Sequence, residues 1–507
     1  MPRKTVLLLA FVFVKFVLQY VLVDAQYDLH RDEYLHLDQG HYLAWGYVSV
    51  PPFTSWVSWI IFALGGGVFW VKFFPALFGA LTLVVVWKAI ETLKGDTFAL
   101  CLGATCVLLS VLLRINLLYQ PNSFDVLCWT SFYYFCLRYA QTESPRWSWL
   151  GAVVFALGFL NKYNMVFLLG GLLPALLLSP QRKWLARRQT YWAVGLALLL
   201  ISPNIWWQYQ NDFPVVHHMQ ELARTQLVNT SRVAFLKEQL LFFAGALPII
   251  VAGLYALLVY KPFAGFRFFF AALVFTLAIF WICKAKGYYA IGIYPIYISF
   301  GAVFVSQALQ TKRLRYVRLL VFMLPVATFL PMYQVAFPNH GPEYVVAHSS
   351  RYQDLGLLRW EDGKDHSLPQ DFADMLGWRE LARKTDSIYA PLAAQGRTMV
   401  LCDNYGQAGA INYYSKTGIR AVSFNADYVG WFDLSVPYIN FIRIKEYDPN
   451  EDELEQTGPY FQTGQIAARV TNQYAREYRT AIFAFSGAKI DINPLLANEV
   501  REANSNR

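Results

Sequence analysis

Charged residues are scarce in this chain. Only 15% of its 507 residues are Asp, Glu, Lys or Arg, and 56% are hydrophobic. A soluble domain carries about 25% charged residues, and the apolar residues here form blocks close to the roughly 20 residues that cross a bilayer as a helix. This composition excludes an ordinary soluble protein. It predicts a polytopic membrane protein followed by a polar C-terminal region.

Cysteines and nucleotide-binding motifs are also sparse. The C-terminal region holds a single cysteine, Cys402, so it cannot form a disulfide within itself, and the six cysteines of the chain show no zinc-site spacing. The glycines within residues 404–409 are not followed by the Lys-Ser/Thr of a phosphate-binding loop. The net charge of +9 is gathered in short loops, which indicates membrane topology rather than nucleic-acid binding.

Eleven apolar segments are predicted to cross the membrane. The first contains Lys15 and lacks a small-residue cleavage site, so we interpret it as an uncleaved span rather than a signal peptide. Residues 53–64 are too few to cross and are interpreted as an interfacial or re-entrant helix. The predicted spans are residues 5–23, 68–90, 97–113, 124–139, 147–160, 165–178, 191–207, 239–260, 266–283, 288–309 and 317–333.

Lysines and arginines orient these spans. They concentrate in alternate loops, and the positive-inside rule makes those loops cytoplasmic. The loop at residues 24–67 and everything after residue 333 are then predicted to lie outside, with the N-terminus in the cytoplasm. The orienting residues are Arg3, Lys4, Arg182, Lys183, Arg187, Arg188, Lys261, Arg267, Lys312, Arg313, Arg315 and Arg318.

The predicted external loops carry many polar side chains. Burying an unpaired charge is costly, so carboxylates at a bilayer edge indicate contact with water, with a partner charge or with a substrate. The carboxylates of the first loop are Asp24, Asp28, Asp32, Glu33 and Asp38. The later loops contribute Arg114, Asp125, Lys162, Lys284 and Lys286, together with Tyr288 and Tyr289.

Such a set suits a substrate in which a sugar is linked through phosphate to a membrane lipid. Transfer of the sugar needs a carboxylate that orients or deprotonates the acceptor, and cations that stabilise the departing phosphate. Asp32 or Glu33 is the candidate carboxylate. Because cations can neutralise the phosphate, no metal ion or other cofactor is expected. The candidate cations are Arg114, Lys162, Lys284 and Lys286.

Residues 339–507 are predicted to form a separate α/β domain. A helix is expected from residue 377, a buried strand over 398–403, a helix over 405–414 and a strand over 420–424. This strand–helix–strand order is typical of a parallel core.

Arg31-Asp32-Glu33 resembles the first-loop acidic motif of the GT-C glycosyltransferases. The chain is most similar to the bacterial dolichyl-phosphate-mannose-protein mannosyltransferase-like family (family 39) and its aminoarabinose-transferase relatives. Further similar segments follow in order along nearly the whole chain: 51–52, 121–125, 158–162, 202–206, 286–289, 294–295 and 404–408. The resemblance implies an α-helical polytopic GT-C bundle in residues 1–338, with a catalytic first external loop at 24–67. It also implies an external α/β domain in residues 339–507.

The resemblance also implies a location and a function. The chain is expected in the bacterial inner (plasma) membrane with its C-terminal domain periplasmic or extracellular. It is expected to transfer a sugar from a polyprenyl-phosphate donor to an external glycan, lipid or protein, with inversion and without a metal. Its partners would be that lipid-linked sugar and membrane lipids, with no nucleic acid.

The family pattern carries over to individual residues. Asp32 matches the catalytic carboxylate, with Glu33 beside it. Asp125 matches a second acidic position, and Lys162 matches a cation near the donor phosphate. The tyrosine pair at 288–289 is a secondary candidate for the donor site.

Two positions depart from the family pattern. Asn122 and Ser123 replace a Thr-Asp pair, and Val50 stands where aminoarabinose transferases have lysine. The second departure argues against modification of lipid A with aminoarabinose.

Several alternatives stay open. A transporter or flippase of lipid-linked sugars, or a membrane-anchored sensor, would break no bond. Asp32 and Glu33 could cap a helix N-terminus, Lys162 could be an interfacial lysine that reaches for water, and Arg114 could pair with Asp125.

The other acidic and histidine side chains of the first loop have plainer interpretations. Asp24 and Asp28 are interpreted as solvated charges, and Asp38 as a bystander. The histidines are spaced unlike a helical metal pair, so a metal site is a minor alternative. These histidines are His30, His36 and His41, with His217 and His218 in a later loop.

Overall fold

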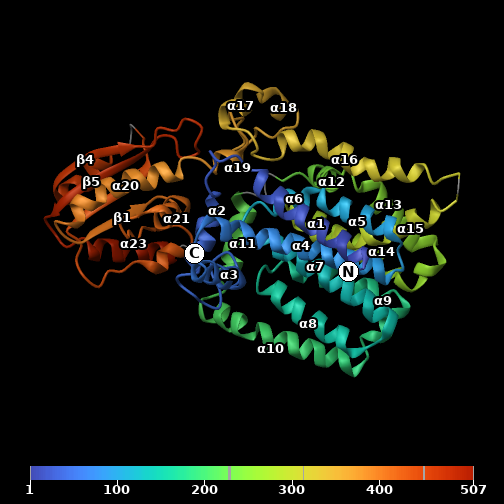
Figure 1. The fold of residues 1–507 in the computed structure, drawn as a ribbon. Helices are drawn as coiled ribbons and strands as arrows, with labels where there is room; N and C mark the ends of the chain where they lie inside the picture. Colours follow the sequence, from blue (N-terminus) through green and yellow to red (C-terminus); the bar gives the residue numbers. More distant parts are fainter. Residues whose placement is uncertain (1, 226–229, 312, 449–451, 506–507) are drawn as a thin grey trace. The chain divides into compact units, whose positions relative to one another are not determined.

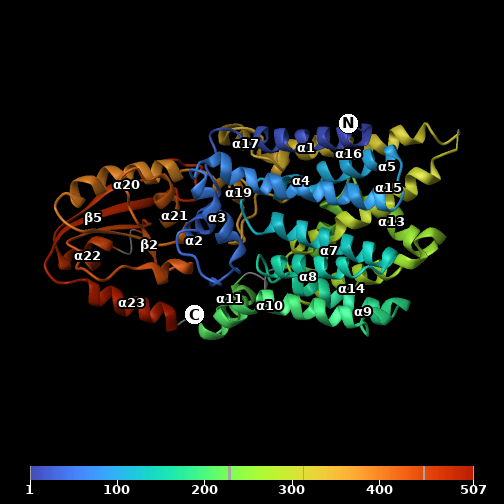
Figure 2. The same cartoon turned by 60° about the horizontal axis from the view of Figure 1, so that its bottom comes forward.

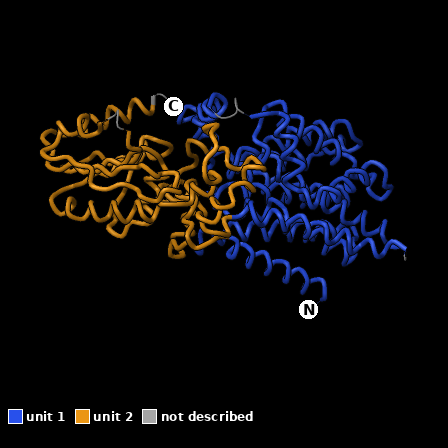
Figure 3. Tube along the Cα trace, turned by 90° about the horizontal axis from the view of Figure 1, so that it is seen from above, with its two compact units in different colours: residues 1–22, 50–54, 69–337 blue, residues 23–49, 55–68, 338–507 orange. Residues whose placement is uncertain are grey.

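The computed structural model describes residues 2–225, 230–311, 313–448 and 452–505. Two compact units divide the chain (Figure 3). Unit 1 comprises residues 1–22, 50–54 and 69–337, and unit 2 comprises residues 23–49, 55–68 and 338–507. The sequence places the loop 24–67 with the membrane domain. In the structure, most of that loop packs with the C-terminal region.

The described part of unit 1 is helical (Figures 1 and 2). Its α-helices are α1 (Arg3–Val21), α4 (Val68–Thr92), α5 (Thr97–Leu108), α6 (Val111–Ile115), α7 (Asn122–Thr142), α8 (Pro145–Phe159), α9 (Met165–Leu177), α10 (Arg188–Gln210), α11 (Pro214–Thr225), α12 (Arg232–Leu241), α13 (Leu247–Val259), α14 (Phe268–Ile282), α15 (Tyr294–Ala308) and α16 (Val317–Val335). Short 3-10 helices are η1 (Pro180–Trp184), η3 (Lys261–Phe266) and η4 (Gly287–Ile293).

Each of the eleven predicted spans overlaps a helix of unit 1. Three of them are divided between two helical elements: 97–113 between α5 and α6, 239–260 between α12 and α13, and 288–309 between η4 and α15. By length and composition, four described helical segments could cross a membrane: Arg3–Val21, Val68–Thr92, Gly287–Ala308 and Val317–Val335. Other apolar helices are shorter, such as α5 with 12 residues and α13 with 13, whereas a crossing needs about 20. The helical membrane-type bundle is confirmed, and the number of crossings stays a prediction.

Small residues let the helices of unit 1 approach closely. A Cβ atom added at Gly301 of α15 would lie 1.8 Å from the backbone oxygen of Ile249 in α13. A Cβ atom added at Gly253 of α13 would lie 2.6 Å from the backbone oxygen of Tyr297. Backbone contact of this kind is typical of helix pairs in membranes, where dispersion contacts rather than hydrophobic exclusion hold helices together.

Unit 2 is built around a mixed five-stranded sheet with strand order β2-β1-β3-β5-β4. β1 (Thr398–Cys402) pairs in parallel with β2 (Val422–Ser423) and with β3 (Asn440–Glu446). β5 (Thr480–Ala488) pairs antiparallel with β3 and with β4 (Phe461–Arg469). The predicted parallel core is confirmed. The antiparallel half was not predicted from the sequence. Its outer strand β4 is a largely exposed edge strand whose sequence lacks an apolar alternation.

Helices cover both faces of this sheet (Figure 2). α20 (Trp378–Ala393) and α21 (Tyr405–Tyr414) pack on one face. On the other face α23 (Asn493–Ser505) buries Leu496 against alternate strand residues such as Leu401 and Phe485, as the two-residue period of a strand requires. The remaining elements of unit 2 are α2 (Arg31–Gln39), most of α3 (Phe53–Ala63), α17 (Pro342–Ala347), α18 (Ser349–Gln353), α19 (Gln370–Ala373), η5 (Ala426–Trp431), α22 (Glu453–Thr457) and η6 (Gly458–Tyr460).

Candidate active-site residues

The acidic loop of the sequence begins a helix in unit 2. His30 is the N-cap of α2, and its Nδ1 accepts a hydrogen bond from the backbone N–H of Asp32 (3.2 Å). The Glu33 carboxylate, which is fully buried, accepts from the backbone N–H of His30 (2.6 Å). The two bonds form a capping box, which satisfies backbone donors that the helix start leaves open. The helix-capping alternative therefore holds for Glu33.

The Asp32 side chain has a different hydrogen-bond partner from that of Glu33. Its side chain is 39% exposed, and its Oδ1 accepts a hydrogen bond from the hydroxyl of Tyr405, the first residue of α21 (2.7 Å). Burial alone would raise the pKa of Asp32, but the nearby His30, the Tyr405 hydroxyl and Arg31 together hold it below its ordinary value. The group is therefore an ionised carboxylate at neutral pH with part of its surface open.

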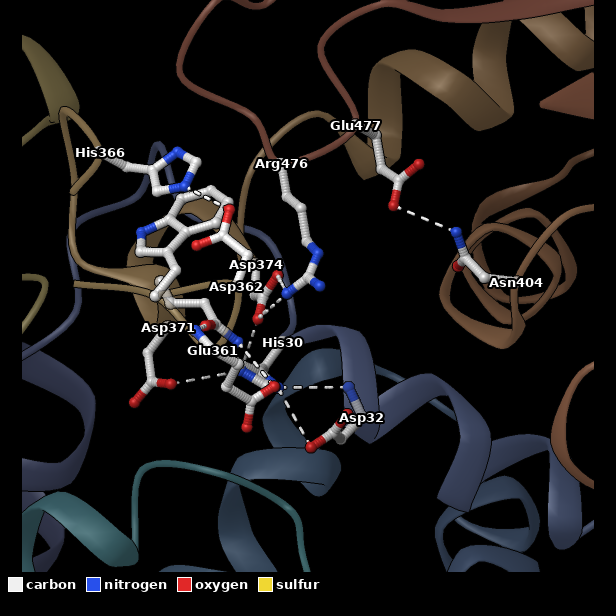
Figure 4. A network of polar contacts seen from close by, with 12 residues as sticks. His30, Asp32, Glu361, Asp362, His366, Asp371, Asp374, Asn404, Arg476 and Glu477 are labelled. Atoms are coloured by element: carbon white, nitrogen blue, oxygen red, sulfur yellow. Dashed lines mark hydrogen bonds and ion pairs between the residues drawn. The ribbon is translucent and has the colours of Figure 1, made fainter. Parts of the chain in front are cut away.

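A network of polar side chains extends from His30 on one side of this carboxylate (Figure 4). The buried Nε2 of His30 lies 3.8 Å from Asp374 and 3.9 Å from Asp371. Arg476 donates to Asp374 at 3.1 Å. Burial raises the pKa of Asp374 despite the attraction of His30 and Arg476. We call His30, Asp32, Asp371, Asp374, Tyr405 and Arg476 the acidic cluster.

The interpretation of Asp28 as a solvated charge is wrong. Its carboxylate is 7% exposed. It accepts from the backbone N–H groups of Trp378 (2.9 Å) and Arg379 (3.1 Å) and pairs with Arg379 Nε (3.0 Å). Because Trp378 and Arg379 form the first turn of α20, Asp28 acts as an anion at a helix N-terminus, where backbone N–H groups are free to donate.

Asp38 is not a bystander either. It is buried, and its Oδ2 accepts from the Tyr428 hydroxyl and the Asn412 amide, both at 2.7 Å. Burial raises the pKa of Asp38 to about 7, although both hydrogen bonds favour the ionised form. Carboxylates beside a membrane segment were expected to face water, a partner charge or a substrate. Asp28 has a partner charge in Arg379, whereas Asp38 is held by the neutral donors Tyr428 and Asn412. Here two of them hold unit 2 together.

The glycines of residues 404–409 serve packing. Asn404 caps α21 by accepting from the backbone N–H of Gln407. A Cβ atom at Gly406 would meet the Arg31 side chain at 2.6 Å, and one at Gly409 would meet Tyr34 of α2 at 2.6 Å. The absence of side chains thus lets α21 lie against α2, which brings Tyr405 to Asp32 and places the Arg31 guanidinium 4.4 Å from the Tyr405 ring centre.

A second group of predicted residues meets in unit 1. Lys162 Nζ donates to Asn122 Oδ1 (2.8 Å) and lies over the rings of Tyr289 (4.5 Å) and Tyr288 (5.2 Å). An ammonium group over aromatic faces keeps its charge available on its remaining side. We call Asn122, Asp125, Lys162, Asn164, Tyr288 and Tyr289 the lysine cluster.

Asp125 and Asn164 hold this cluster together. The Asn164 amide donates to Asp125 Oδ2 (3.0 Å) and to the backbone oxygen of Tyr289 (2.9 Å). The indole of Trp129 donates to Asp125 Oδ1 (3.0 Å). Asp125 is 4% exposed and both of its oxygens are occupied. Asp125 therefore links α7 to Asn164, which directly precedes α9 and in turn holds the backbone of η4.

The other predicted cations lie in unit 1 as well. Arg114 lies in the short helix α6 and is partly buried. Lys284 is exposed and has φ 51°, and its backbone oxygen accepts from the Thr230 hydroxyl. Lys286 directly precedes η4, the helix that carries Tyr288 and Tyr289.

The three histidines of the first loop have separate roles. His30 caps α2, His36 contacts the Gln39 side chain (3.2 Å), and His41 stacks on Phe62 with ring centres 4.0 Å apart. Throughout the described residues, no group of three or more His, Cys, Asp or Glu side chains is arranged to hold a metal ion.

Sequence reasoning missed part of both clusters. Asp371, Asp374 and Arg476 were not expected beside Asp32, since each lies more than 300 residues away in the sequence. His30 is two residues before Asp32, but its role as the helix cap was not predicted. For Tyr405 a signal existed: a tyrosine between a helix cap and a glycine, in a segment that resembles the family.

Comparison with known proteins supports the expected relationship. Residues 49–207 match the family model of dolichyl-phosphate-mannose-protein mannosyltransferase. The lipid A galacturonosyltransferase RgtD of Rhizobium johnstonii is 28% identical over 198 residues, which make up 37% of this chain and 41% of that protein. The chain is thus matched over less than half of the length of this curated relative.

Two solved structures resemble the whole fold. ArnT from Cupriavidus metallidurans bound to undecaprenyl phosphate has a TM-score of 0.62 at 15% identity, covering 95% of this chain and 98% of that one. The apo state of the same protein has a TM-score of 0.64 at 14% identity, with the same coverage. At these identities the likeness is one of fold alone. Together with the family match over residues 49–207, it supports the expected similarity of this chain to the GT-C membrane glycosyltransferases.

Proposed function

We propose that the chain transfers a sugar from a polyprenyl-phosphate donor to an acceptor hydroxyl or amine, by single displacement and without a metal ion. The observation that carries the proposal is the state of Asp32. This carboxylate is partly exposed, oriented by Tyr405 and kept ionised by the surrounding charges. An ionised carboxylate with an open side can accept the proton of an incoming nucleophile.

The proposed reaction moves one proton, forms one bond to the anomeric carbon and breaks one bond from it. The acceptor hydroxyl gives its proton to Asp32 while its oxygen attacks the anomeric carbon. The bond from that carbon to the phosphate oxygen breaks, and its electron pair stays on the phosphate. Displacement from the opposite face inverts the anomeric configuration. The products are the glycosylated acceptor and polyprenyl phosphate.

The lysine cluster is proposed to bind the donor phosphate. Lys162 supplies the positive charge, and we assign further hydrogen-bond donors to the hydroxyls of Tyr288 and Tyr289, whose ring centres lie 5.2 Å and 4.5 Å from Lys162 Nζ. Charge-assisted hydrogen bonds of this kind are about twice as strong as neutral ones. Solved ArnT was captured with undecaprenyl phosphate, which supports a lipid phosphate as the ligand class. We assign Arg114, Lys284 and Lys286 to the same region as secondary cations.

The proposed location in the cell rests on the Lys and Arg residues of alternate loops and on the family resemblance. We propose a multi-pass protein of a bacterial inner membrane, with the N-terminus cytoplasmic and unit 2 on the outer side. The acceptor would approach from that side.

Purified protein in nanodiscs, incubated with undecaprenyl phosphate carrying different sugars, tests the proposal. We expect release of undecaprenyl phosphate, and complete loss of this release in Asp32→Asn with an unchanged thermal midpoint. Asp354→Asn, an exposed carboxylate of unit 2, is the matched control and should behave like the wild type. Near-normal turnover by Asp32→Asn would overturn the assignment. Movement of the intact donor across vesicles without release would favour the flippase alternative.

A further inference from the structure

Lys15 is an unusual residue of unit 1. It lies in the middle of α1, where it is 3% exposed among apolar helices. Burying an ammonium group is costly unless its protons find acceptors. Within the described part of the chain, the Gln19 side-chain oxygen is the one hydrogen-bond acceptor of Lys15 Nζ. An ammonium group has three donors, so two of them need acceptors elsewhere.

A small cavity lies beside this ammonium group. Its volume is about 10 Å³, and its polar lining consists of Lys15, Thr82 and Asn116. That volume is near the lower limit for one water molecule. Asn116 is 3% exposed, and its side-chain oxygen has no hydrogen-bond partner among the residues that the structure describes. The cavity is therefore about the size of one water molecule. It is lined by an acceptor that is not used, Asn116 Oδ1, and by a donor that is only partly used, Lys15 Nζ.

Gly79 keeps this space open. A Cβ atom added there would lie 2.1 Å from Asn116 Oδ1 and 2.7 Å from Lys15 Cε. Both polar side chains thus point to the same spot, which lies over a glycine of α4. The close approach accounts for a glycine in the middle of a helix, where it costs about 1 kcal/mol relative to alanine.

Asn116 leads from this cavity to the lysine cluster. Its amide donates to Ser123 Oγ (2.9 Å), and the Ser123 hydroxyl donates to the backbone oxygen of Ile115 (3.3 Å). The residue before Ser123 is Asn122, which accepts from Lys162 Nζ (2.8 Å). The buried side chain of Asn116 thus fixes one end of the turn between α6 and α7. At the other end of this turn, Asn122 contacts Lys162.

We propose that this cavity binds one water molecule, which accepts from Lys15 Nζ and donates to Asn116 Oδ1. Through this water, Lys15 acts as a positioning residue for Asn122 and Lys162. The water site stands on the cavity alone, while its effect on phosphate binding rests on the proposed function.

A density map of the full-length protein, at a resolution that shows ordered water, tests the site directly. We expect a single peak within hydrogen-bond distance of both Lys15 Nζ and Asn116 Oδ1. An empty cavity, or a direct contact between the two side chains, would overturn the water site whether or not the protein transfers sugar.

Binding of undecaprenyl phosphate tests the positioning role. Lys15→Met and Gly79→Ala should each raise the Kd about 3- to 10-fold, as expected for losing one hydrogen-bonded link. The Kd of the double variant should not exceed the higher Kd of the two single variants, because both changes break the same link. Gly195→Ala, at a helix glycine with open space around its Cβ position, is the control.

The outcomes separate the two proposals. Additive effects of Lys15→Met and Gly79→Ala, or an unchanged Kd in both, would overturn the positioning role. Failure of the wild type to bind undecaprenyl phosphate would instead count against the proposed function, and the density peak would still decide the water site.

Discussion

The hydroxyl of Tyr405 donates a 2.7 Å hydrogen bond to Oδ1 of Asp32, although 373 residues separate the two in the chain. The bond joins the first turn of α21 to the first turn of α2. It holds the carboxylate in one orientation and favours its ionised form. The candidate catalytic carboxylate is thus prepared by the C-terminal region as well as by its own loop.

Tyr405→Phe is expected to raise the pKa of Asp32, because the lost hydrogen bond stabilises the ionised form. The acid limb of the pH–rate profile should therefore move to higher pH. A hydrogen bond to a charged group is worth about 1.5–3 kcal/mol, and the partial exposure of Asp32 reduces this, so we expect a fall in kcat/KM of about tenfold. Tyr478→Phe, at an exposed hydroxyl, should leave the profile in place. An unshifted acid limb in Tyr405→Phe would contradict the role of this bond.

Asp38→Asn is expected to stabilise the protein at neutral and higher pH. The pKa of Asp38 is about 7 when folded and near 3.9 when unfolded, so the folded state binds the extra proton and stability falls as pH rises from about 4 to 7. The asparagine side chain still accepts hydrogen bonds from Tyr428 and Asn412 but does not titrate. The variant therefore avoids the pH-dependent loss of stability, which is at most about 4 kcal/mol. Thermal midpoints in nanodiscs between pH 4.5 and 8.5 measure the effect. The midpoints of variant and wild type should converge at the acidic end, and a constant difference across the range would show that Asp38 does not titrate there.

Gly409→Ala is expected to destabilise unit 2 by about 1–3 kcal/mol, the usual cost of overpacking. The added methyl would lie 2.5 Å from the Tyr428 hydroxyl and 2.6 Å from Tyr34 Cβ. Helix propensity alone predicts the opposite sign, since alanine is favoured over glycine by about 1 kcal/mol. Gly430→Ala, with open space around the Cβ position, is the control. A higher thermal midpoint for Gly409→Ala would show that α21 can move away from α2 without cost.

Lys162→Met is expected to weaken binding of undecaprenyl phosphate by about 10- to 100-fold, which corresponds to the loss of a charged hydrogen bond. Lys162→Arg should retain part of the affinity, because the charge remains while the fit over Tyr289 changes. Lys88→Met, which removes an exposed lysine paired with Glu91, is the control. Equal affinities for all three variants, measured by native mass spectrometry, would place the phosphate elsewhere.

The features that could be predicted from the sequence are those that follow from the pattern of residues within one segment of the chain. The apolar blocks locate the helices of unit 1, and the strand–helix–strand order near Thr398 locates the parallel half of the sheet. Lys162 and the tyrosine pair were expected together and do meet. Asp32 was chosen over the other acids of its loop, and in the structure it is the one hydrogen-bonded to Tyr405.

Features that depend on contacts between distant segments could not be predicted from local patterns. Asp28 and Asp38 look like solvent-facing acids until their partners in α20, α21 and η5 are known. Glu33 resembles its neighbour Asp32 in sequence, and only the capping geometry at His30 separates their roles. The polar surroundings of Lys15 could not be predicted either, because its polar neighbour Asn116 lies about 100 residues away in the sequence.

The division of unit 2 among separate stretches of chain has a consequence for biosynthesis. Residues 23–49 leave the ribosome early, but their partners in residues 338–507 follow only after unit 1 has been made. At about 5–20 residues per second, roughly 20 to 75 s pass between the synthesis of Asp32 and that of Tyr405. Throughout that interval the nascent chain carries a carboxylate without its hydroxyl partner, so a chain cut short before α21 would insert as a bundle yet hold no finished acidic cluster.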